Sequence, residues 1–228
     1  MIGNLCAYFG NTWVGMFIKS NNEKTFVPPD CSEKFIKIIE ENLKTEVAVL
    51  SLGESNLLGI YMALNTNGAV LPNTTMKEEA VVLKEHGLNV YVSNEKHNAH
   101  GNNIVVNDNG GLINERVSTE EKRKIEDVLG VELLESKIAG YNTVGSACLA
   151  TNRGFLAHYA ASEKELRLLK ETLKVPGNVG TVNIGVGFIS YGVIANTNGY
   201  VAGEKTSGFE LGRVEEALGL IKNDVVMV

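Results

Sequence analysis

The sequence predicts a mixed α/β fold in which five copies of one unit of about 45 residues close into a ring. We expect a single domain over residues 1–228, because the copies fill the chain. A turn motif and a helix-start motif recur with nearly the same period, and apolar segments follow one order around each pair of motifs. Together these three observations indicate a repeated supersecondary unit.

The turn motif is the first landmark. NTNG occurs twice, at 65–68 and 196–199, and each copy lies between short apolar runs. Asn and Gly accept the positive φ angles of tight hairpin turns more readily than other residues. Related tetrapeptides complete a set that starts at Ser20, Asn65, Asn107, Thr151 and Asn196. The starts are 45, 42, 44 and 45 residues apart, so the motif divides the chain into five units.

The helix-start motif is the second landmark. In a capping box, a Ser, Thr or Asp and a Glu three residues later satisfy backbone N–H groups at a helix N-terminus. The pattern occurs at Asp30 with Glu33, Thr75 with Glu78, Ser118 with Glu121, Ser162 with Glu165, and Ser207 with Glu210. The spacings are 45, 43, 44 and 45 residues, which match those of the turns closely. Two independent landmarks with one period favour a true repeat over chance.

The apolar segments give the order of elements within a unit. An amphipathic segment of roughly ten to twelve residues follows each helix start, with Phe35, Ile39 and Leu43 on one face of the first. β-branched runs come next, at 47–50, 90–92, 131–134, 182–184 and 225–228. Further apolar runs precede the turns, for example at 60–64, 104–106 and 147–150. Each unit is therefore expected to contain a strand, a hairpin turn, a strand, a capped helix and a strand.

The ends of the row of units favour a closed ring. A single unit cannot bury its own apolar face, and no atypical polar unit ends the row. Closure also removes exposed sheet edges. Residues 1–9 precede the first turn without forming a complete unit, so we expect them to complete the last unit and fasten the ring.

Composition limits the class of partner. The chain has 228 residues, is 44% apolar, and carries a net charge of −6 with a pI of about 5.3. Such a protein is not expected to bind a nucleic acid by phosphate neutralisation alone, although a local basic patch remains open. An acidic protein can still dock on a ribonucleoprotein through protein contacts.

Cysteine usage and the N-terminus indicate the cytoplasm. Cys6, Cys31 and Cys148 are odd in number and lack CxxC spacing, so they predict neither a disulfide framework nor a zinc site. The stretch MIGNLCAYFG lacks the basic region and apolar core of a signal peptide. The most apolar stretch, 182–195, is too short to span a bilayer, so we expect a soluble protein without a membrane partner.

The ordered motifs resemble those of a known family. Five ββαβ units resemble the pentein architecture, a five-bladed α/β propeller. GNTWVG at Gly10, SLGESNLLG at Ser51, GNNIVVNDNG at Gly101 and VPGNVGTVNIG at Val175 resemble the archaeal and eukaryotic translation initiation factor 6 family over the whole chain. The chain stops at Val228 without the tail of eukaryotic members, so the resemblance is to the archaeal type.

The resemblance implies a function without chemistry. It implies a ribosome anti-association factor that binds the large (50S) subunit on its joining face, keeps the small subunit away and takes part in large-subunit biogenesis. It implies no cofactor, no metal and no small-molecule substrate, and we expect a monomer. By resemblance, Asn102, Asn65, Asn103 and Asn56 match the ribosome-facing surface of the family.

The same asparagines have a structural interpretation. Asn56 with Gly59, Asn98 with Gly101, and Asn142 with Gly145 share an N-x-x-G spacing. Turn formation alone would account for that spacing. The GNN stretch at 101–103 exceeds this need, because a turn there requires only the glycine, and amide side chains offer both a donor and an acceptor to a partner.

A pentein-fold hydrolase or amidinotransferase acting on arginine-like substrates is the alternative. Those enzymes use a Cys nucleophile near the C-terminal end, a His and carboxylates. Here the last cysteine is Cys148, which lies beside Ala147 and Leu149 and is expected to be a buried small hydrophobe, with His158 packed or on the surface. A central channel lined by Cys, His and two carboxylates would favour the enzyme. A channel lined by small residues and water would favour the binding factor.

Two polar clusters are explained without a binding or catalytic role. His97 and His100 in HNAH lack a third ligand of matching spacing, so we expect solvated loop histidines rather than a metal site. The basic run at 122–124 lies among acidic residues on a predicted helix. A solvated helix face explains the run, and an RNA-phosphate contact is the other interpretation.

Overall fold

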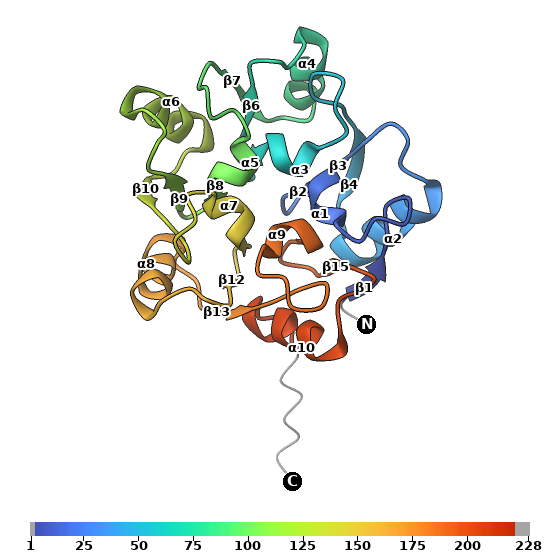
Figure 1. Ribbon diagram of the computed structural model, residues 1–228. Helices are drawn as coiled ribbons and strands as arrows, with labels where there is room; N and C mark the ends of the chain where they lie inside the picture. The colour runs from blue at the N-terminus through green and yellow to red at the C-terminus, as the bar shows by residue number, and fades with distance from the viewer. Residues whose placement is uncertain (1–2, 222–228) are drawn as a thin grey trace.

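The structure, a computed structural model that describes residues 3–221, confirms the predicted fold class. Five three-stranded sheets surround a central axis, with short helices near the axis and longer helices at the periphery (Figure 1). Each sheet and its two helices form one blade. Within residues 3–221, no helix is both long enough and apolar enough to cross a membrane.

Every blade has the same order of elements: a one-turn helix, an inner strand, a middle strand, a longer helix and an outer strand. Blade 1 contains α1 (Val14–Phe17), β2 (Lys19–Ser20), β3 (Lys24–Val27), α2 (Glu33–Leu43) and β4 (Glu46–Val49). Blade 2 contains α3 (Leu58–Tyr61), β5 (Ala63–Leu64), β6 (Gly68–Pro72), α4 (Lys77–Glu85) and β7 (Asn89–Ser93). Blade 3 contains α5 (His100–Asn103), β8 (Ile104–Val106), β9 (Gly111–Asn114), α6 (Thr119–Leu129) and β10 (Leu133–Ser136).

Blade 4 follows the same order, whereas the outer strand of blade 5 comes from the N-terminus. Blade 4 contains α7 (Val144–Ala147), β11 (Cys148–Ala150), β12 (Phe155–His158), α8 (Glu163–Leu173) and β13 (Gly177–Gly180). Blade 5 contains α9 (Ile189–Gly192), β14 (Val193–Ala195), β15 (Tyr200–Gly203) and α10 (Gly208–Ala217), and takes β1 (Gly3–Cys6) as its outer strand. The strand expected at 225–228 lies outside the described residues.

The strand pairing follows from the connections. Each inner strand pairs antiparallel with its middle strand across a tight turn, and in blades 1–4 the middle strand pairs parallel with an outer strand that follows it across a helix. In blade 5, β1 pairs parallel with β15 in the register Gly3 to Tyr200 through Cys6 to Gly203. The N-terminal segment thus occupies the position that the chain after the helix occupies in the other four blades.

Both landmarks of the repeat need a correction in the first blades. The N-cap of α2 is Ser32 rather than Asp30, and that of α4 is Met76 rather than Thr75; Ser118, Ser162 and Ser207 are confirmed as N-caps. The first turn starts at Asn21, one residue later than expected, because Asn21 N–H donates to the Lys24 carbonyl oxygen at 3.0 Å. Corrected N-caps and corrected turns then have identical spacings of 44, 42, 44 and 45 residues.

Two expected strands differ in the structure. The first residues of the run 60–64 belong to α3, because the chain makes one helical turn before each inner strand. The run 182–184 is a loop with positive φ angles of 48° at Asn183 and 63° at Ile184. The outer strand of blade 4 is instead the glycine-rich β13. The sequence pattern does not predict this strand, because its glycines are required by packing: a Cβ atom at Gly177 would lie 2.4 Å from the Phe155 ring.

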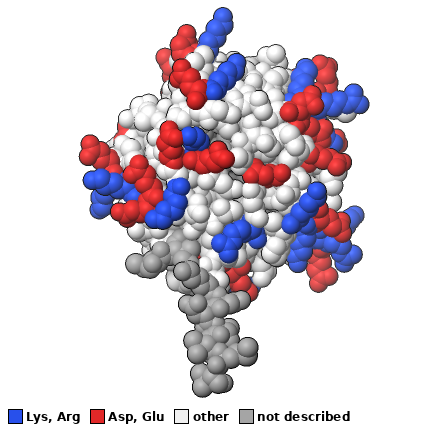
Figure 2. All heavy atoms as spheres, turned by 180° about the vertical axis from the view of Figure 1, so that it is seen from behind, with Lys and Arg blue, Asp and Glu red and all other residues white. Residues whose placement is uncertain are grey.

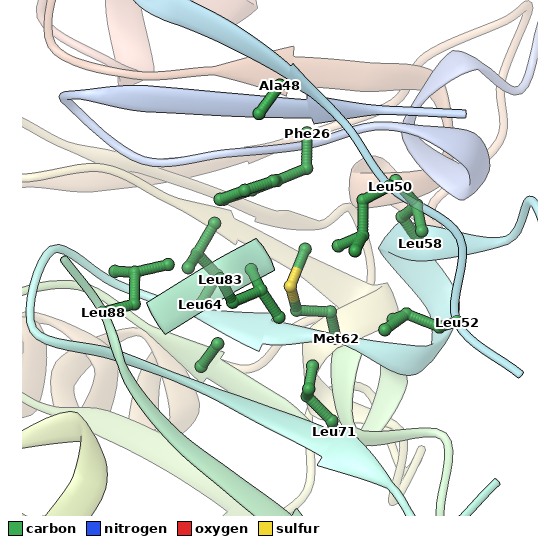
Figure 3. Packing of buried hydrophobic residues seen from close by; sticks show 11 residues of the cluster. Phe26, Ala48, Leu50, Leu52, Leu58, Met62, Leu64, Leu71, Leu83 and Leu88 are labelled. Carbon is green, nitrogen blue, oxygen red and sulfur yellow. The ribbon is translucent and has the colours of Figure 1, made fainter. Parts of the chain in front are cut away.

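The hydrophobic core lies between neighbouring blades. In the cluster of Figure 3, Phe26 and Ala48 of blade 1 face Leu64, Met62 and other residues of blade 2. Phe26 and Met62 are fully buried. Since burying a large apolar side chain contributes about 1.5–3 kcal/mol, these contacts stabilise the packing of one blade on the next.

Candidate functional site

A central channel has two different ends. The one-turn helices α1, α3, α5, α7 and α9 contact one another around one end, which we call the helix end (Figure 1). The inner strands run from these helices to the turns that start at Asn21, Asn65, Asn107, Thr151 and Asn196, which form the turn end. Between the two ends lies a cavity of about 50 Å³, lined mainly by small and apolar residues of the inner strands.

Glycines bring the helices of the helix end into main-chain contact. Gly15, Gly59, Gly101 and Gly145 occupy one position of the repeat, and Ser190 occupies it in blade 5. A Cβ atom at Gly59 would lie 1.8 Å from the Gly15 carbonyl oxygen, and one at Gly101 would lie 2.0 Å from that of Gly59. The interpretation of Gly101 as a turn residue is therefore wrong, because it lies within α5 and lets the neighbouring helix approach.

Asn102 lies in a polar cluster that joins three blades. It follows Gly101 in α5, and Ser146 and Tyr191 occupy the same repeat position in α7 and α9. Burial raises the pKa of the Tyr191 hydroxyl, and hydrogen bonding from Ser146 and Asn102 opposes that rise. Asn102 is half-buried, and its Oδ1 is covered without a hydrogen-bond partner among the described residues. An amide oxygen left in this state costs free energy that a new partner can recover.

Two more asparagines precede the one-turn helices. Oδ1 of Asn142, before α7, is also covered without a partner among residues 3–221. Asn56, before α3, is half-buried, and its Nδ2 donates to both carboxylate oxygens of Asp30 at 3.1 Å. Tyr8 donates its hydroxyl to the same carboxylate, so Asn56 belongs to a contact between blades 1 and 2.

Asn65 lies at the turn end, away from Asn102. Its side chain is 3% exposed. Oδ1 accepts from the N–H groups of Asn67 and Gly68, and Nδ2 donates to the carbonyl oxygens of Asn107 at 3.4 Å and Leu129 at 2.8 Å. Asn65 thus closes its own turn and fastens the next blade.

The same contact recurs around the turn end. Asn21 donates to the Asn65 carbonyl oxygen at 2.9 Å, Asn107 to that of Thr151 at 3.0 Å, and Asn196 to that of Asn21 at 3.2 Å. Thr151 has no amide to continue the pattern, and Nη1 of the following Arg153 donates to the Thr197 carbonyl oxygen at 3.2 Å instead. The turn motif therefore provides hydrogen bonds that hold neighbouring blades together.

Asn103 is an internal side chain of blade 3. It is 5% exposed, its Nδ2 donates to the His97 carbonyl oxygen at 2.8 Å, and its Oδ1 accepts from Asn114 at 2.8 Å. The four candidate asparagines consequently do not form one surface. Asn56 and Asn102 lie part-exposed at the helix end, Asn103 lies inside blade 3, and Asn65 lies inside the turn end.

The residues for guanidino chemistry are not gathered in the channel. Cys148 lines it, is 1% exposed, and has a thiol pKa raised by burial. The described residues that line the cavity between the two ends include no His, Asp or Glu, and the lining of the turn end includes Asp108. His158 lies instead in an aromatic cluster, with ring centroids 4.5 Å from Tyr159 and 5.8 Å from Phe188, and burial lowers its pKa.

The histidine expectation is half wrong. His97 is half-buried, but His100 is fully buried in α5, and neither of its ring nitrogens has a partner among the described residues. Burial lowers the pKa of His100 to about 4, and the carboxylates of Glu121 and Glu95 oppose this shift. Within residues 3–221, no group of three or more His, Cys, Asp or Glu side chains is placed to hold a metal ion.

The basic run on α6 is paired with carboxylates. The Lys122 side chain is 19% exposed, and its Nζ lies 3.5 Å from Glu135 Oε1. Lys124 Nζ lies 2.8 Å from Glu120 and 3.0 Å from Glu121. Figure 2 shows that basic and acidic side chains lie intermixed on the face seen from behind, without a broad area of one sign. Lys122 is thus half-buried rather than fully solvated.

Sequence reasoning missed Ser146 and Tyr191. The signal that identifies them is the corrected period, since 102, 146 and 191 are separated by the same 44 and 45 residues as the corresponding turns. Aromatic side chains join them at the helix end: Trp13 precedes α1, and Tyr141 and Phe188 precede α7 and α9 with ring centroids 5.0 Å apart. Part-exposed aromatic residues are enriched in protein–protein interfaces.

Comparison with known proteins assigns the family. The model of the eIF-6 family matches residues 4–217. The chain is 38% identical over 208 residues to Translation initiation factor 6 of Picrophilus torridus, covering 91% of this chain and 95% of that protein. It is 38% identical over 211 residues to the protein of that name from Pyrobaculum aerophilum, covering 92% and 96%. For Saccharolobus islandicus the identity is 39% over 214 residues, covering 92% and 96%. The chain therefore belongs to the eIF-6 family.

Proposed function

We propose that this protein is a cytoplasmic anti-association factor that binds the large ribosomal subunit through its helix end and so prevents the small subunit from joining. Its relatives carry the name translation initiation factor 6, which supports a role in initiation. The proposal requires no cofactor, because occupying the joining surface is enough to block the small subunit. A part in large-subunit biogenesis belongs to the same proposal.

The amide oxygen of Asn102, which has no described partner, is the observation that favours the helix end over the turn end as the ribosome-binding surface. At the turn end the asparagine side chains are engaged by neighbouring blades, as Asn65 shows. At the helix end, Oδ1 of Asn102 and Oδ1 of Asn142 are covered without a described partner. A surface that reorients these amides and supplies donors would recover roughly 1–3 kcal/mol for each. Tyr141, directly before Asn142, adds apolar contact area there, and Trp13 precedes α1 at the same end of the channel.

The four asparagines then have two kinds of role. We assign direct contact with the large subunit to Asn102 and Asn56, whose side chains are part-exposed. We assign a positioning role to Asn65 and Asn103, whose amides hold the ring and blade 3 together. The first pair should change affinity with little effect on folding, and the second should change stability first.

Sedimentation with purified subunits tests the proposal. The protein should cosediment with isolated large subunits, at up to one copy per subunit, and not with isolated small subunits. Binding should persist at raised salt, because a surface of amides and aromatic residues depends less on phosphate neutralisation than a basic patch does. Equal cosedimentation with both subunits, or none with the large subunit, would reject it.

A further inference from the structure

Lys19 places an amino group in the central channel. It belongs to β2 and is one of the residues that line the cavity between the two ends. The same repeat position is apolar in the other four blades, where it holds Ala63, Val105, Leu149 and Ile194. Among the described residues that line this cavity, Lys19 is the single side chain that carries a charge at neutral pH, and Asp108 lines the neighbouring pocket at the turn end.

The ammonium group of Lys19 has no compensating partner. Burial alone lowers its pKa to about 8, without a carboxylate or a hydrogen bond in the described chain to oppose the shift. Cys148, the other titratable residue of the lining, is neutral because burial raises the pKa of its thiol. On the neighbouring strand β3, Lys24 is paired with Glu46. Lys19 is half-buried, so its ammonium group loses part of its hydration without a counter-charge, and an anion from solution would offset that cost.

Backbone groups of the inner strands add hydrogen-bonding capacity. Asn21 N–H bonds to the Lys24 carbonyl oxygen, so in this antiparallel pair the N–H and C=O groups of Ser20 point away from β3. The same pairing at the other four turns directs the backbone of Leu64, Val106, Ala150 and Ala195 away from their middle strands. All five residues line the channel, so their N–H and C=O groups face it.

We propose that the channel binds one protonated inorganic oxyanion, with hydrogen phosphate as the fitting example, through Lys19 Nζ and the inward-facing backbone groups. Phosphate oxygens accept from the ammonium and the N–H groups, and the one P–OH group of hydrogen phosphate donates to one of the C=O groups that alternate with them. The cavity of about 50 Å³ exceeds the roughly 10–15 Å³ that one water requires, so it has room for such an ion. This site is separate from the proposed ribosome-binding surface, and neither proposal requires the other.

Protonation links the site to pH. Only the ammonium form of Lys19 attracts an anion, so binding should weaken as the pH rises through the pKa of this lysine. Conversely, a bound anion favours the charged form and should raise that pKa above about 8.

Titration of Lys19 by NMR is the direct test. The Cε–Hε signals of the wild-type protein are followed against pH in a zwitterionic buffer, with 50 mM phosphate, sulfate or chloride at one ionic strength. The signal that disappears in Lys19→Met identifies the residue. Phosphate should raise the pKa of Lys19 by about one unit or more. Sulfate carries no O–H donor at this pH and should raise that pKa less. An unchanged pKa in all three salts would overturn the proposal, and an equal rise in all three would show general screening and overturn it too.

Thermal unfolding gives a second readout with a matched control. Phosphate should raise the Tm of the wild type more than that of Lys19→Met, because a ligand that binds only the folded state stabilises it. Lys37→Met, at an exposed position of α2, removes the same charge and should respond to phosphate as the wild type does. Equal phosphate-dependent shifts in all three proteins would contradict the site. If Lys19→Met does not fold, the wild-type titration decides alone, with Lys19→Arg identifying the signal.

Discussion

Asn102 and Asn65 look alike in sequence but have opposite situations in the fold. Asn102 has an amide oxygen without a described partner, whereas Asn65 uses both ends of its amide. We expect Asn102→Ala to weaken binding to the large subunit by about 1–3 kcal/mol, or roughly 5- to 150-fold. Its Tm should fall by no more than about 4 °C, because Oδ1 makes no bond in the free protein and only the hydrogen bond to the Tyr191 hydroxyl is lost. A binding titration and a thermal scan measure the two effects.

Asn65→Ala and Lys122→Ala are the controls for that prediction. Asn65→Ala removes the bonds to Leu129 and Gly68 and should lower the Tm by roughly 5–15 °C. Lys122→Ala removes the ion pair between half-buried Lys122 of the outer helix α6 and exposed Glu135 of β10, and should change binding by less than about 1 kcal/mol. If a folded Asn102 variant binds normally and Lys122→Ala strongly weakens binding, the ribosome-binding surface lies on the peripheral helices of the ring instead.

The cysteines are expected to be dispensable for binding. Burial raises the thiol pKa of Cys6, Cys31 and Cys148, to about 11 for Cys31, so all three are protonated and unreactive at neutral pH. Replacing Cys6 and Cys31 by Ser and Cys148 by Ala should leave binding within a few-fold and cost about 1–3 kcal/mol of stability. A folded triple variant that no longer binds, or release of ammonia or citrulline from arginine by the wild type, would favour the enzyme interpretation.

His100 predicts a pH dependence of stability. Its pKa is about 4 in the folded protein, against about 6.5 in an unfolded chain. Between these values the unfolded state binds more protons, so stability should fall as the pH falls from about 6.5 to 4, by at most roughly 3 kcal/mol. Denaturant unfolding at several pH values measures this, and the difference between wild type and His100→Leu isolates the residue. Parallel pH profiles of the two proteins would show that folding does not lower the pKa of His100.

At the scale of elements, the glycines of the helix end set how closely the one-turn helices pack. A Cβ atom at Gly101 would meet the main-chain oxygen of Gly59, which has no freedom to move aside. Gly101→Ala should therefore destabilise the protein by more than about 2 kcal/mol in denaturant unfolding. Gly212→Ala is the matched control, because a Cβ atom there meets nothing within 4 Å inside α10. It should stabilise the helix by about 0.5–1 kcal/mol. Equal effects of the two substitutions would contradict the close packing.

The larger elements were predictable because each has a local cause. The longer helices have caps and an apolar face, as Ser162 and Leu169 show in α8, and the turns have side chains that bond their own backbone. The one-turn helices were not predictable, since four residues have no periodicity and the N-cap residue of α5, Ala99, provides no side-chain cap. The strand β13 was missed because its glycines are selected by a distant aromatic ring, which no local pattern reveals.

The candidate site was predictable only in part, for the same reason. A resemblance of motifs selected Asn102 and Asn65 together, but position in the chain does not tell which end of the channel a residue faces. That depends on the direction of the inner strands, which run from α3 to the turn at Asn65. Tyr191 joins Asn102 only because the ring places α9 and α5 on either side of α7.

At the scale of the whole molecule, closure makes the five blades one unit. The outer strand of blade 5 comes from the N-terminus through β1, and Asn196 donates to the Asn21 carbonyl oxygen across the same junction. Each end of the channel is thereby a continuous circle of equivalent positions. A rigid ring can present the part-exposed residues of several blades to one surface without ordering them on binding, which lowers the entropic cost of association.

Subunit joining is the measurement that tests the central claim most directly. Purified large and small subunits are mixed under conditions that favour joining, and the joined fraction is followed by sucrose-gradient sedimentation against the concentration of this protein. The account predicts that the wild type lowers the joined fraction until one copy is bound per large subunit, and that Asn102→Ala needs roughly 5- to 150-fold more protein for the same effect. An unchanged joined fraction when every large subunit carries a copy would contradict it.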